Sequence, residues 1–255
     1  MTPTGYVINL AASPDRMAHA RAELDGHGIR PERVEGLDGR QIDPTTYPGY
    51  DDARARAYMG RSMTGGELGC FVGHRRALTA LVESGAPLAP VFEDDIAFRA
   101  EADRVLPALL DWLTTSDLDW HCVNIGARRL KITTPVAEIA GAHLVRAHYF
   151  PMLAHAMIWS RAGALAYLEA AEEIFCPADN MMRYVLTRSD KGFALTQALV
   201  DAGRFDSDIS ARSGGDRGAH GRAPGYGLLK QRRLWQEKAL AFRHKLFGAW
   251  LRQGS

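Results

Sequence analysis

The sequence lacks several features that mark common classes of protein. No run of apolar residues approaches the length of about 18 that a membrane-spanning helix needs, so we expect no such helix. The first residues carry no basic stretch followed by a long apolar core, and we therefore expect no secretion by a standard signal peptide. The three cysteines, Cys70, Cys122 and Cys176, are far apart and have no zinc-type spacing, which predicts free thiols in a reducing compartment.

The chain as a whole also lacks a large net charge, since it has 31 Lys and Arg and 30 Asp and Glu. The distribution is uneven. Residues 212–255 hold ten Lys or Arg and two Asp or Glu, a charge of +8, which leaves −7 on the preceding residues. An acidic body repels nucleic acid, so we expect no nucleic-acid partner.

Apolar runs and capping signals predict an α/β protein. A strand over 6–10 leads directly into a helix with Ser13 as N-cap and Pro14 as its first residue. Thr64 and Glu67 have the spacing of a capping box and begin a longer helix. Strands over 33–35, 88–92, 121–125 and 154–159 alternate with helices over 106–113 and 161–173. This alternation predicts a mostly parallel central sheet flanked by helices.

Three acidic residues, Glu93, Asp94 and Asp95, follow directly on the apolar strand 88–92. Alternation along an extended chain would place Glu93 and Asp95 on one side and Asp94 on the other, so that two like charges converge. A hard divalent cation such as Mg²⁺ or Mn²⁺ would relieve their repulsion and would also bind phosphate oxygens. The alternative is a solvated acidic turn, which the composition favours about equally.

Five segments in this order resemble glycosyltransferase family 25, the bacterial lipooligosaccharide galactosyltransferases and their relatives: YVINLAASPDR, GELGCFVGHRRAL, PVFEDDIAF, LAHAMIWSRAGALAYL and CPADNMM. The resemblance extends from about Gly5 to Ile209. It implies a GT-A-like nucleotide-sugar-binding domain over 1–211, followed by a basic loop and helical tail over 212–255. It further implies a metal-dependent inverting transfer of a hexose, with galactose expected, from a UDP-sugar to a lipooligosaccharide or other cell-surface glycan acceptor.

The resemblance also implies roles for individual residues. Asp95, with Glu93, would hold Mn²⁺ or Mg²⁺. Asp179 would be the general base, with Glu93, Asp94 or Glu67 as replacements. The alternative for Asp179 is a helix N-cap, since it follows Pro177. The residues that would bind the UDP-sugar are Asn9, Leu10, Arg16, Asp38, Glu67, Asp94 and His155.

Several of these residues have plainer alternatives. Arg16 could be a solvated residue of a first helical turn, and Asp38 could belong to a β-turn. Glu67, Cys70 and His74 share one stripe of their helix, so His74 is a candidate catalytic residue, although a buried histidine with a structural role is at least as common. His155 could contact phosphate or acceptor, or could be a strand residue bonded to backbone.

Gly73 departs from the family pattern, which has serine before the histidine. A glycine inside a helix costs about 0.5–1 kcal/mol relative to alanine. This departure is the one hint of a degenerate member that binds a sugar nucleotide without turnover. A metal-dependent phosphoesterase that uses the same carboxylates is the other alternative.

The C-terminal residues predict an amphipathic helix with an apolar seam flanked by Lys and Arg. The seam consists of Leu228, Trp235, Phe242, Leu246 and Trp250. Such a helix suits the headgroup region of an anionic membrane, so we expect a cytoplasmic enzyme that rests on the inner face of the membrane, near a lipid-linked acceptor. The alternative is a helix that packs on the protein's own core.

Overall fold

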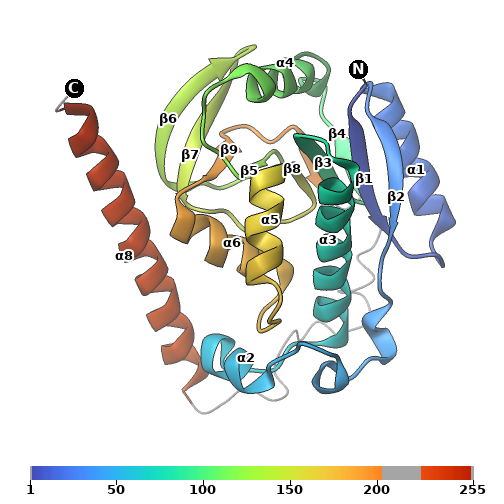
Figure 1. The fold of residues 1–255 in the computed structure, drawn as a ribbon, viewed down its shortest axis with the longest axis vertical. Coiled ribbons are helices and arrows are strands. Elements are labelled where there is room, and N and C mark those ends of the chain that lie inside the picture. Colours follow the sequence, from blue (N-terminus) through green and yellow to red (C-terminus); the bar gives the residue numbers. More distant parts are fainter. Residues whose placement is uncertain (1, 203–224, 254–255) are drawn as a thin grey trace.

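The protein is built around a single large sheet, which a computed structural model places at the centre of the fold (Figure 1). The structure describes residues 2–202 and 225–253. The eight strands of this sheet lie in the order β2-β1-β3-β8-β5-β9-β7-β6. Their bounds are β1 (Thr4–Asn9), β2 (Arg30–Glu35), β3 (Leu88–Glu93), β5 (Cys122–Asn124), β6 (Lys131–Ile139), β7 (Ala142–Tyr149), β8 (Ala156–Ser160) and β9 (Gly192–Leu195).

Six of these strands run in one direction, and only β7 and β8 run against them. A separate antiparallel pair joins β4 (Ile96–Phe98) to β10 (Val200–Ala202). The predicted class, an α/β fold with a mostly parallel central sheet, is therefore confirmed.

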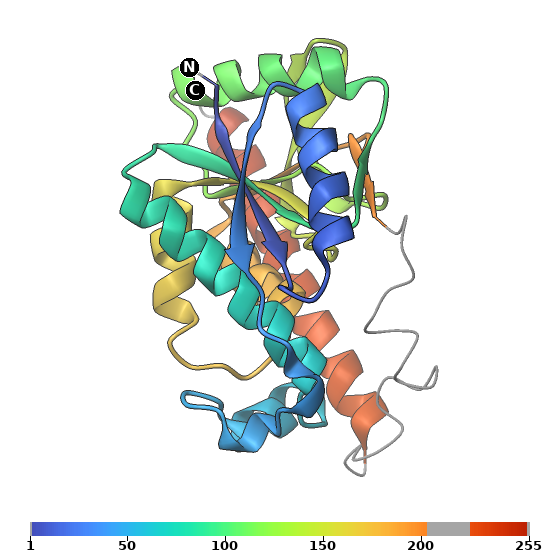
Figure 2. The same ribbon diagram turned by 90° about the vertical axis from the view of Figure 1, so that its right-hand side faces the viewer.

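Helices cover both faces of the sheet. Figure 2 shows α1 and α3 on opposite sides of β1 and β2. The described helices are α1 (Pro14–Gly26), α2 (Asp52–Met59), α3 (Gly65–Ser84), α4 (Ala102–Thr115), α5 (Arg161–Ala170), α6 (Ala178–Ser189) and α8 (Tyr226–Gln253), with short 3₁₀ turns η1 (Gly39–Gln41) and η2 (Pro44–Thr46). Buried side chains form one core with α3, α5 and α6 and a second core with α1 and α4.

Alternation along the strands supplies both cores. In β1, Tyr6 belongs to the core under α3 and Val7 to the core under α1; in β3, Val91 and Phe92 divide in the same way. Successive side chains of a strand point to opposite faces, so a sheet covered on both sides needs continuous apolar runs. The short strand 88–92 was recognisable in the sequence for this reason.

The capping box predicted for the long helix is present. The Thr64 hydroxyl accepts from the Glu67 amide, and the Glu67 carboxylate accepts from the Thr64 amide at 2.9 Å. Ser13 occupies the N-cap position of α1 as predicted, but its side chain makes no capping hydrogen bond. Several elements were not predicted from the sequence, among them the helix α2, the antiparallel hairpin β6–β7 and the short strands β4, β9 and β10.

The first turn of α3 meets the chain after β2 at backbone distance. A Cβ atom on Gly65 would lie 2.0 Å from the Gly39 carbonyl oxygen, and one on Gly69 would lie 2.4 Å from the Leu37 carbonyl oxygen. Because backbone atoms fill this space, only glycine fits at these positions. The contact fixes the segment after β2 against α3.

The proposed boundary between residues 211 and 212 and most of the loop before the tail lie outside the described residues. Among residues 2–202 and 225–253, no helix combines the length and apolar character needed to cross a bilayer. The predicted C-terminal helix is present as α8, which lies along one side of the molecule (Figure 1) and contacts α2, α6, β6 and β7.

Candidate active site

The three acidic residues after β3 contact different partners. The strand ends at Glu93, and Asp94 and Asp95 form the turn that leads to β4. Strict alternation therefore stops before Asp94, and the predicted separation of Asp94 from Asp95 is wrong: both lie beside Arg16. Nη2 of Arg16 is 2.5 Å from Oδ1 of Asp94 and 3.9 Å from Oδ2 of Asp95.

Asn9 and Arg16 hold Asp94 from the end of β1 and the first turn of α1. Nδ2 of Asn9 donates to Oδ2 of Asp94 at 2.7 Å and to the Ser13 carbonyl at 2.9 Å. Arg33 in turn donates to Oδ1 of Asn9 at 3.0 Å. The alternative of a solvated Arg16 is thus wrong, because its side chain is only 18% exposed and pairs with carboxylates. Arg33 had no sequence signal that tied it to this site.

Asp95 is buried, and one of its oxygens is left without a partner. Burial raises the pKa of Asp95, the nearby charge of Glu93 raises it further, and Arg16 opposes both effects. Oδ1 of Asp95 has no hydrogen-bond partner among the described residues. A buried carboxylate oxygen without a donor is costly, so this atom fits a cation or a water molecule. The alternative of a solvated acidic turn does not describe Asp94 and Asp95, which are only 7% and 8% exposed.

Glu93 faces the long helix α3. Its Oε1 lies 3.4 Å from Nε2 of His74 and 3.8 Å from Sγ of Cys70. Burial alone would raise the pKa of Glu93, but the hydrogen bond and charge of His74 lower it. Burial raises the pKa of the Cys70 thiol well above its usual value. Cys70 was visible in the sequence on the stripe with His74, but only the structure places it against Glu93.

These three groups are the set of potential metal ligands that lies closest together in the described chain. Their ligand atoms all fall within 4.8 Å of one another. A thiol with a raised pKa is protonated at neutral pH and is a poor ligand for Mg²⁺ or Mn²⁺, which prefer oxygen. The chemistry of the set therefore favours His74 as the residue that orients Glu93, and Asp95 as the oxygen ligand for a hard cation.

Glu67, on the same stripe of α3, already has hydrogen-bond partners. Its carboxylate accepts from Nη1 and Nη2 of Arg61 at 2.8 and 2.6 Å, in addition to the Thr64 amide. Glu67 and His74 thus have different partners, Arg61 and Glu93, and a cleft that both of them face stays a prediction.

Gly73 has a packing role that the sequence did not reveal. A Cβ atom at this position would lie 2.6 Å from Cγ2 of Ile8 on β1. The glycine lets α3 approach the sheet closely. It therefore gives no support to the degenerate alternative.

Asp179 lies in the first turn of α6, after Pro177 as N-cap. The alternative that Asp179 is itself the N-cap is wrong. Burial raises its pKa, hydrogen bonds and the charge of Arg183 lower it, and the charge of Glu67 raises it. Its influence on Cys70 also places it near α3. The first turn of α6 and the end of β3 thus bring two acidic groups, Asp179 and Glu93, toward the same helix, α3.

His155 precedes β8 and is 4% exposed. Its Nε2 lies 3.2 Å from the Val200 carbonyl oxygen, and its ring packs on Gly126, where a Cβ atom would lie 2.3 Å from Nε2. His155 is therefore bonded to backbone, which was the alternative to contact with phosphate or acceptor. Its charge still lowers the pKa of Glu93 and Asp95, so the ring belongs to the electrostatic surroundings of the carboxylates.

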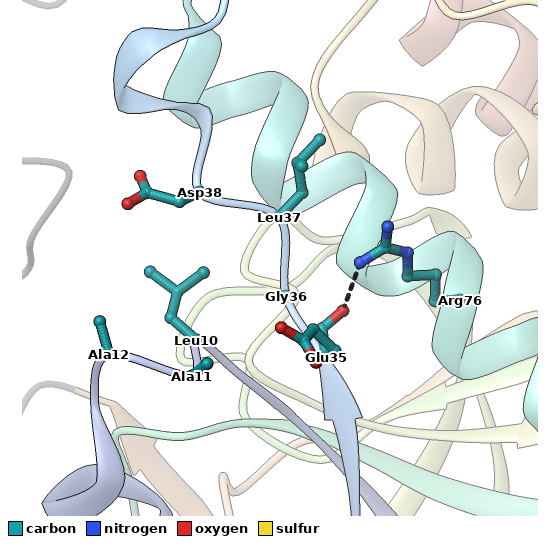
Figure 3. Close-up of a pocket in the computed structure, with 8 residues that line it drawn as sticks. All are labelled: Leu10, Ala11, Ala12, Glu35, Gly36, Leu37, Asp38 and Arg76. Atoms are coloured by element: carbon teal, nitrogen blue, oxygen red, sulfur yellow. Dashed lines mark hydrogen bonds between the residues drawn. The ribbon is translucent and has the colours of Figure 1, made fainter.

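A cavity of about 570 Å³ opens at the carboxyl ends of β1 and β2 (Figure 3). Its lining consists of Leu10, Ala11, Ala12, Glu35, Gly36, Leu37, Asp38 and Arg76. Its volume is within the range of about 300–1,000 Å³ that takes a small-molecule ligand. Arg76, which sequence reasoning missed, donates to the Glu35 carbonyl at 2.8 Å. Asp38 lines the cavity, pairs with Arg40 and caps η1, which corrects the simple β-turn alternative.

The N-terminal half of the chain is similar to a known protein family. A family model described as glycosyltransferase family 25 (LPS biosynthesis protein) matches residues 2–134. The chain belongs to glycosyltransferase family 25. The match includes β1, the cavity, α3 and the three acidic residues after β3.

Relatives in family 25 include both galactosyltransferases and proteins described as inactive. The chain is 30% identical over 153 residues to procollagen galactosyltransferase 1 of Danio rerio, covering 56% of this chain and 25% of the relative. It is 32% identical over 152 residues to a probable inactive glycosyltransferase 25 family member 3 of Rattus norvegicus, covering 56% and 26%. The aligned part spans only about a quarter of these relatives.

Among solved structures, the chain is similar to a glycosyltransferase involved in glycosylation of the major capsid of PBCV-1. The TM-score is 0.43 at 8% sequence identity, and the match covers 80% of this chain and 93% of that chain.

Proposed function

We propose that this family 25 protein transfers a hexose, with galactose expected, from a UDP-sugar to a glycan acceptor with inversion at the sugar carbon. The observation that carries the proposal is the buried pair Asp94 and Asp95 after β3, where Asp94 accepts a hydrogen bond from Asn9, the neighbour in sequence of the cavity residue Leu10. Ligands of open α/β sheets bind at the carboxyl ends of strands. The nucleoside would occupy the cavity, and the diphosphate would lie toward the carboxylates.

A divalent cation fits the residues present. Oδ1 of Asp95 is a buried oxygen without a donor, and Asp94 is next to it in the same turn. We propose Asp95 as the direct ligand of Mn²⁺ or Mg²⁺, with Glu93 nearby. When bound, such a cation neutralises charge that develops on the departing nucleotide.

The protein's own side chains would prepare this site. Arg16 and Asn9 hold Asp94 in place, so that the turn after β3 keeps one conformation. His74 holds Glu93 from α3. Positioned groups that need no reorganisation during the reaction contribute most to the stabilisation of developing charge.

Asp179 is the proposed general base. A base must be deprotonated to accept the proton of the acceptor hydroxyl, and a carboxylate with a raised pKa is a stronger base. Burial raises the pKa of Asp179, whereas His74 lowers that of Glu93. This difference favours Asp179 over Glu93 for the step, while Asp94 and Glu67 are already paired with Arg16 and Arg61.

We propose a lipooligosaccharide precursor or another lipid-linked or cell-surface glycan as the acceptor, and a cytoplasmic location at the inner face of the membrane. Support for the membrane location comes from the charge and exposed apolar residues of α8. Support for this acceptor comes from the family, which is described as one of LPS biosynthesis proteins.

The deciding experiment is a panel of UDP-, GDP- and CMP-sugars incubated with the full-length protein and Mn²⁺, with nucleotide release and sugar transfer both measured. We expect release from UDP-sugars alone. Release of phosphate from simple phosphate esters would favour a phosphoesterase. Saturable UDP-sugar binding without release, in the presence of candidate acceptors, would indicate a protein that binds but does not turn over.

The Asp179→Asn variant should lose transfer by about 100-fold, because removal of a general base costs about 10²–10⁴-fold. Its stability should not fall. A carboxylate whose folded pKa is raised lowers stability once pH exceeds its unfolded value, so the uncharged amide is expected to be neutral or stabilising at pH 7. The measurements are kcat against pH and thermal unfolding. A large loss of stability together with activity would assign Asp179 a structural role instead.

A further inference from the structure

The C-terminal helix α8 presents two different faces. One face is docked on the body of the protein: Ala241 is fully buried and Glu237 is 4% exposed. Oε1 of Glu237 accepts from the Tyr58 hydroxyl on α2 at 2.7 Å, and the Arg233 guanidinium lies over the Tyr58 ring. The alternative that the helix packs on the protein's own core is therefore correct for this face.

The opposite face exposes large apolar side chains. Leu228, Trp235, Phe242 and Leu246 are 79%, 66%, 53% and 69% exposed. Their spacings of seven, seven and four residues place them in one stripe, and this stripe lies half a turn away from Glu237 and Ala241. Elsewhere in the described chain, large exposed apolar side chains occur only singly, at Leu153 and Leu165. Docking on the body does not explain the stripe, which is on the side turned away from it.

Basic residues flank this stripe on both sides. Helical geometry places Arg232 and Arg243 along one edge and Lys238 and Lys245 along the other. The only carboxylate in the sequence between residues 226 and 248 is Glu237, and it belongs to the docked face. The outward surface of α8 over these residues is thus apolar along its middle, and every charged side chain at its edges is a cation.

A basic cavity adjoins the helix. A hollow of about 390 Å³ between α2, α6 and α8 is lined in part by Arg188, Arg232 and Arg233. The Arg188 guanidinium stacks on the Tyr184 ring at 3.5 Å from its centroid. No described carboxylate forms an ion pair with any of the three arginines, and Glu237, which also lines the hollow, accepts the Tyr58 hydroxyl. Several guanidinium groups that line one hollow suit a phosphate group.

We propose that the outward face of α8 binds the surface of an anionic phospholipid bilayer, with the arginine-lined hollow taking the phosphate of a lipid headgroup. The apolar stripe would enter the boundary between headgroups and acyl chains, and the flanking Lys and Arg would remain at the level of the phosphates. A second copy of this chain fits less well. Two such helices packed along their stripes would bring their rows of cations together without any carboxylate between them.

This inference deepens the membrane location proposed above by assigning it to particular residues, and it does not depend on the transferase activity. Membrane binding would use residues of α8 and α6, whereas the donor would bind at the ends of β1, β2 and β3. Vesicle binding and donor hydrolysis can therefore fail independently of each other.

The test is cosedimentation of the full-length protein with vesicles of phosphatidylcholine alone and of phosphatidylcholine mixed with phosphatidylglycerol. We expect binding to the anionic vesicles only, and weaker binding as salt is raised. The Trp235→Ser/Phe242→Ser double variant should bind about tenfold more weakly or worse. Leu165→Ser, which removes an equally exposed leucine from α5, is the matched control and should bind like the unmodified protein.

The Arg188→Gln/Arg232→Gln double variant tests the hollow, and it should lose most of the preference for anionic vesicles. Equal binding to both kinds of vesicle, or unchanged binding by the Trp235→Ser/Phe242→Ser variant, would overturn the proposal. So would a concentration-dependent dimer that this variant abolishes, since the stripe would then bind a second copy. Thermal stabilisation by inorganic phosphate without vesicle binding would assign the hollow to a soluble anion. Circular dichroism and donor hydrolysis verify that each variant is folded.

Discussion

Asp95→Asn is expected to lower Mn²⁺-dependent nucleotide release from a UDP-sugar by about 100-fold or more, because the amide removes the charge that would hold the cation at the developing negative charge. Among the buried carboxylate oxygens of this site in the described residues, Oδ1 of Asp95 is the one without a hydrogen-bond partner. Kinetics over a range of Mn²⁺ concentrations measure the effect. The concentration needed for half-maximal rate should rise in the variant.

Asp111→Asn provides the matched control for this substitution. Asp111 is an exposed aspartate in the second half of α4. Its variant should keep the rate and the Mn²⁺ dependence of the unmodified protein. Metal-dependent release that survives Asp95→Asn unchanged would eliminate Asp95 as a ligand and leave Glu93 or Asp94 to be tested in its place.

Gly65→Ala should destabilise the protein by about 3 kcal/mol, the upper part of the range for overpacked sites. The new Cβ atom would lie 2.0 Å from the Gly39 carbonyl oxygen and 2.6 Å from that of Ile42, and backbone atoms cannot turn aside as a flexible side chain can. Relief of the contact would move the segment after β2, which lines the cavity with Leu37 and Asp38. Donor affinity should fall together with the melting temperature.

Gly26→Ala is the control that separates the effect of the backbone contact at Gly65 from the effect of alanine on helix propensity. Gly26 ends α1, its φ is not positive, and a Cβ atom there would meet nothing within 4 Å. Alanine should be neutral or stabilise by about 0.5 kcal/mol, because it loses less backbone entropy on folding. Chemical denaturation of both variants measures the difference. Equal stability of the two would show that the chain after β2 yields to α3 without cost.

The sequence predicted those helices and strands that are stabilised by interactions between residues close together in the chain. The capping box of Thr64 and Glu67 predicted where α3 begins, because its two hydrogen bonds join residues only three apart. The apolar run before Glu93 predicted β3 and placed the acidic residues at its end. The hairpin β6–β7 escaped detection, in part because β6 is an edge strand that contains Pro135 and a register shift near it.

The partners of the site residues depend on contacts between distant parts of the chain. Asn9 and Asp94 are 85 residues apart, and Glu93 and His74 come from a strand and a helix whose relative position is decided by core packing. In the sequence, Gly73 is only a departure from the family's serine, and its packing against Ile8 depends on how α3 lies on the sheet.

The charge of +1 over the whole chain likewise conceals a tail with a charge of +8, and residue order alone reveals that division. Which side of α8 faces the body is a tertiary property. Only one face of a helix can pack against the body of the protein. Because Glu237 contacts Tyr58 on that body, Trp235 and Phe242 on the opposite face point outward. The sequence therefore determined which residues carry charge and apolar surface, while the packing of the helices determined which of them meet one another and which meet solvent.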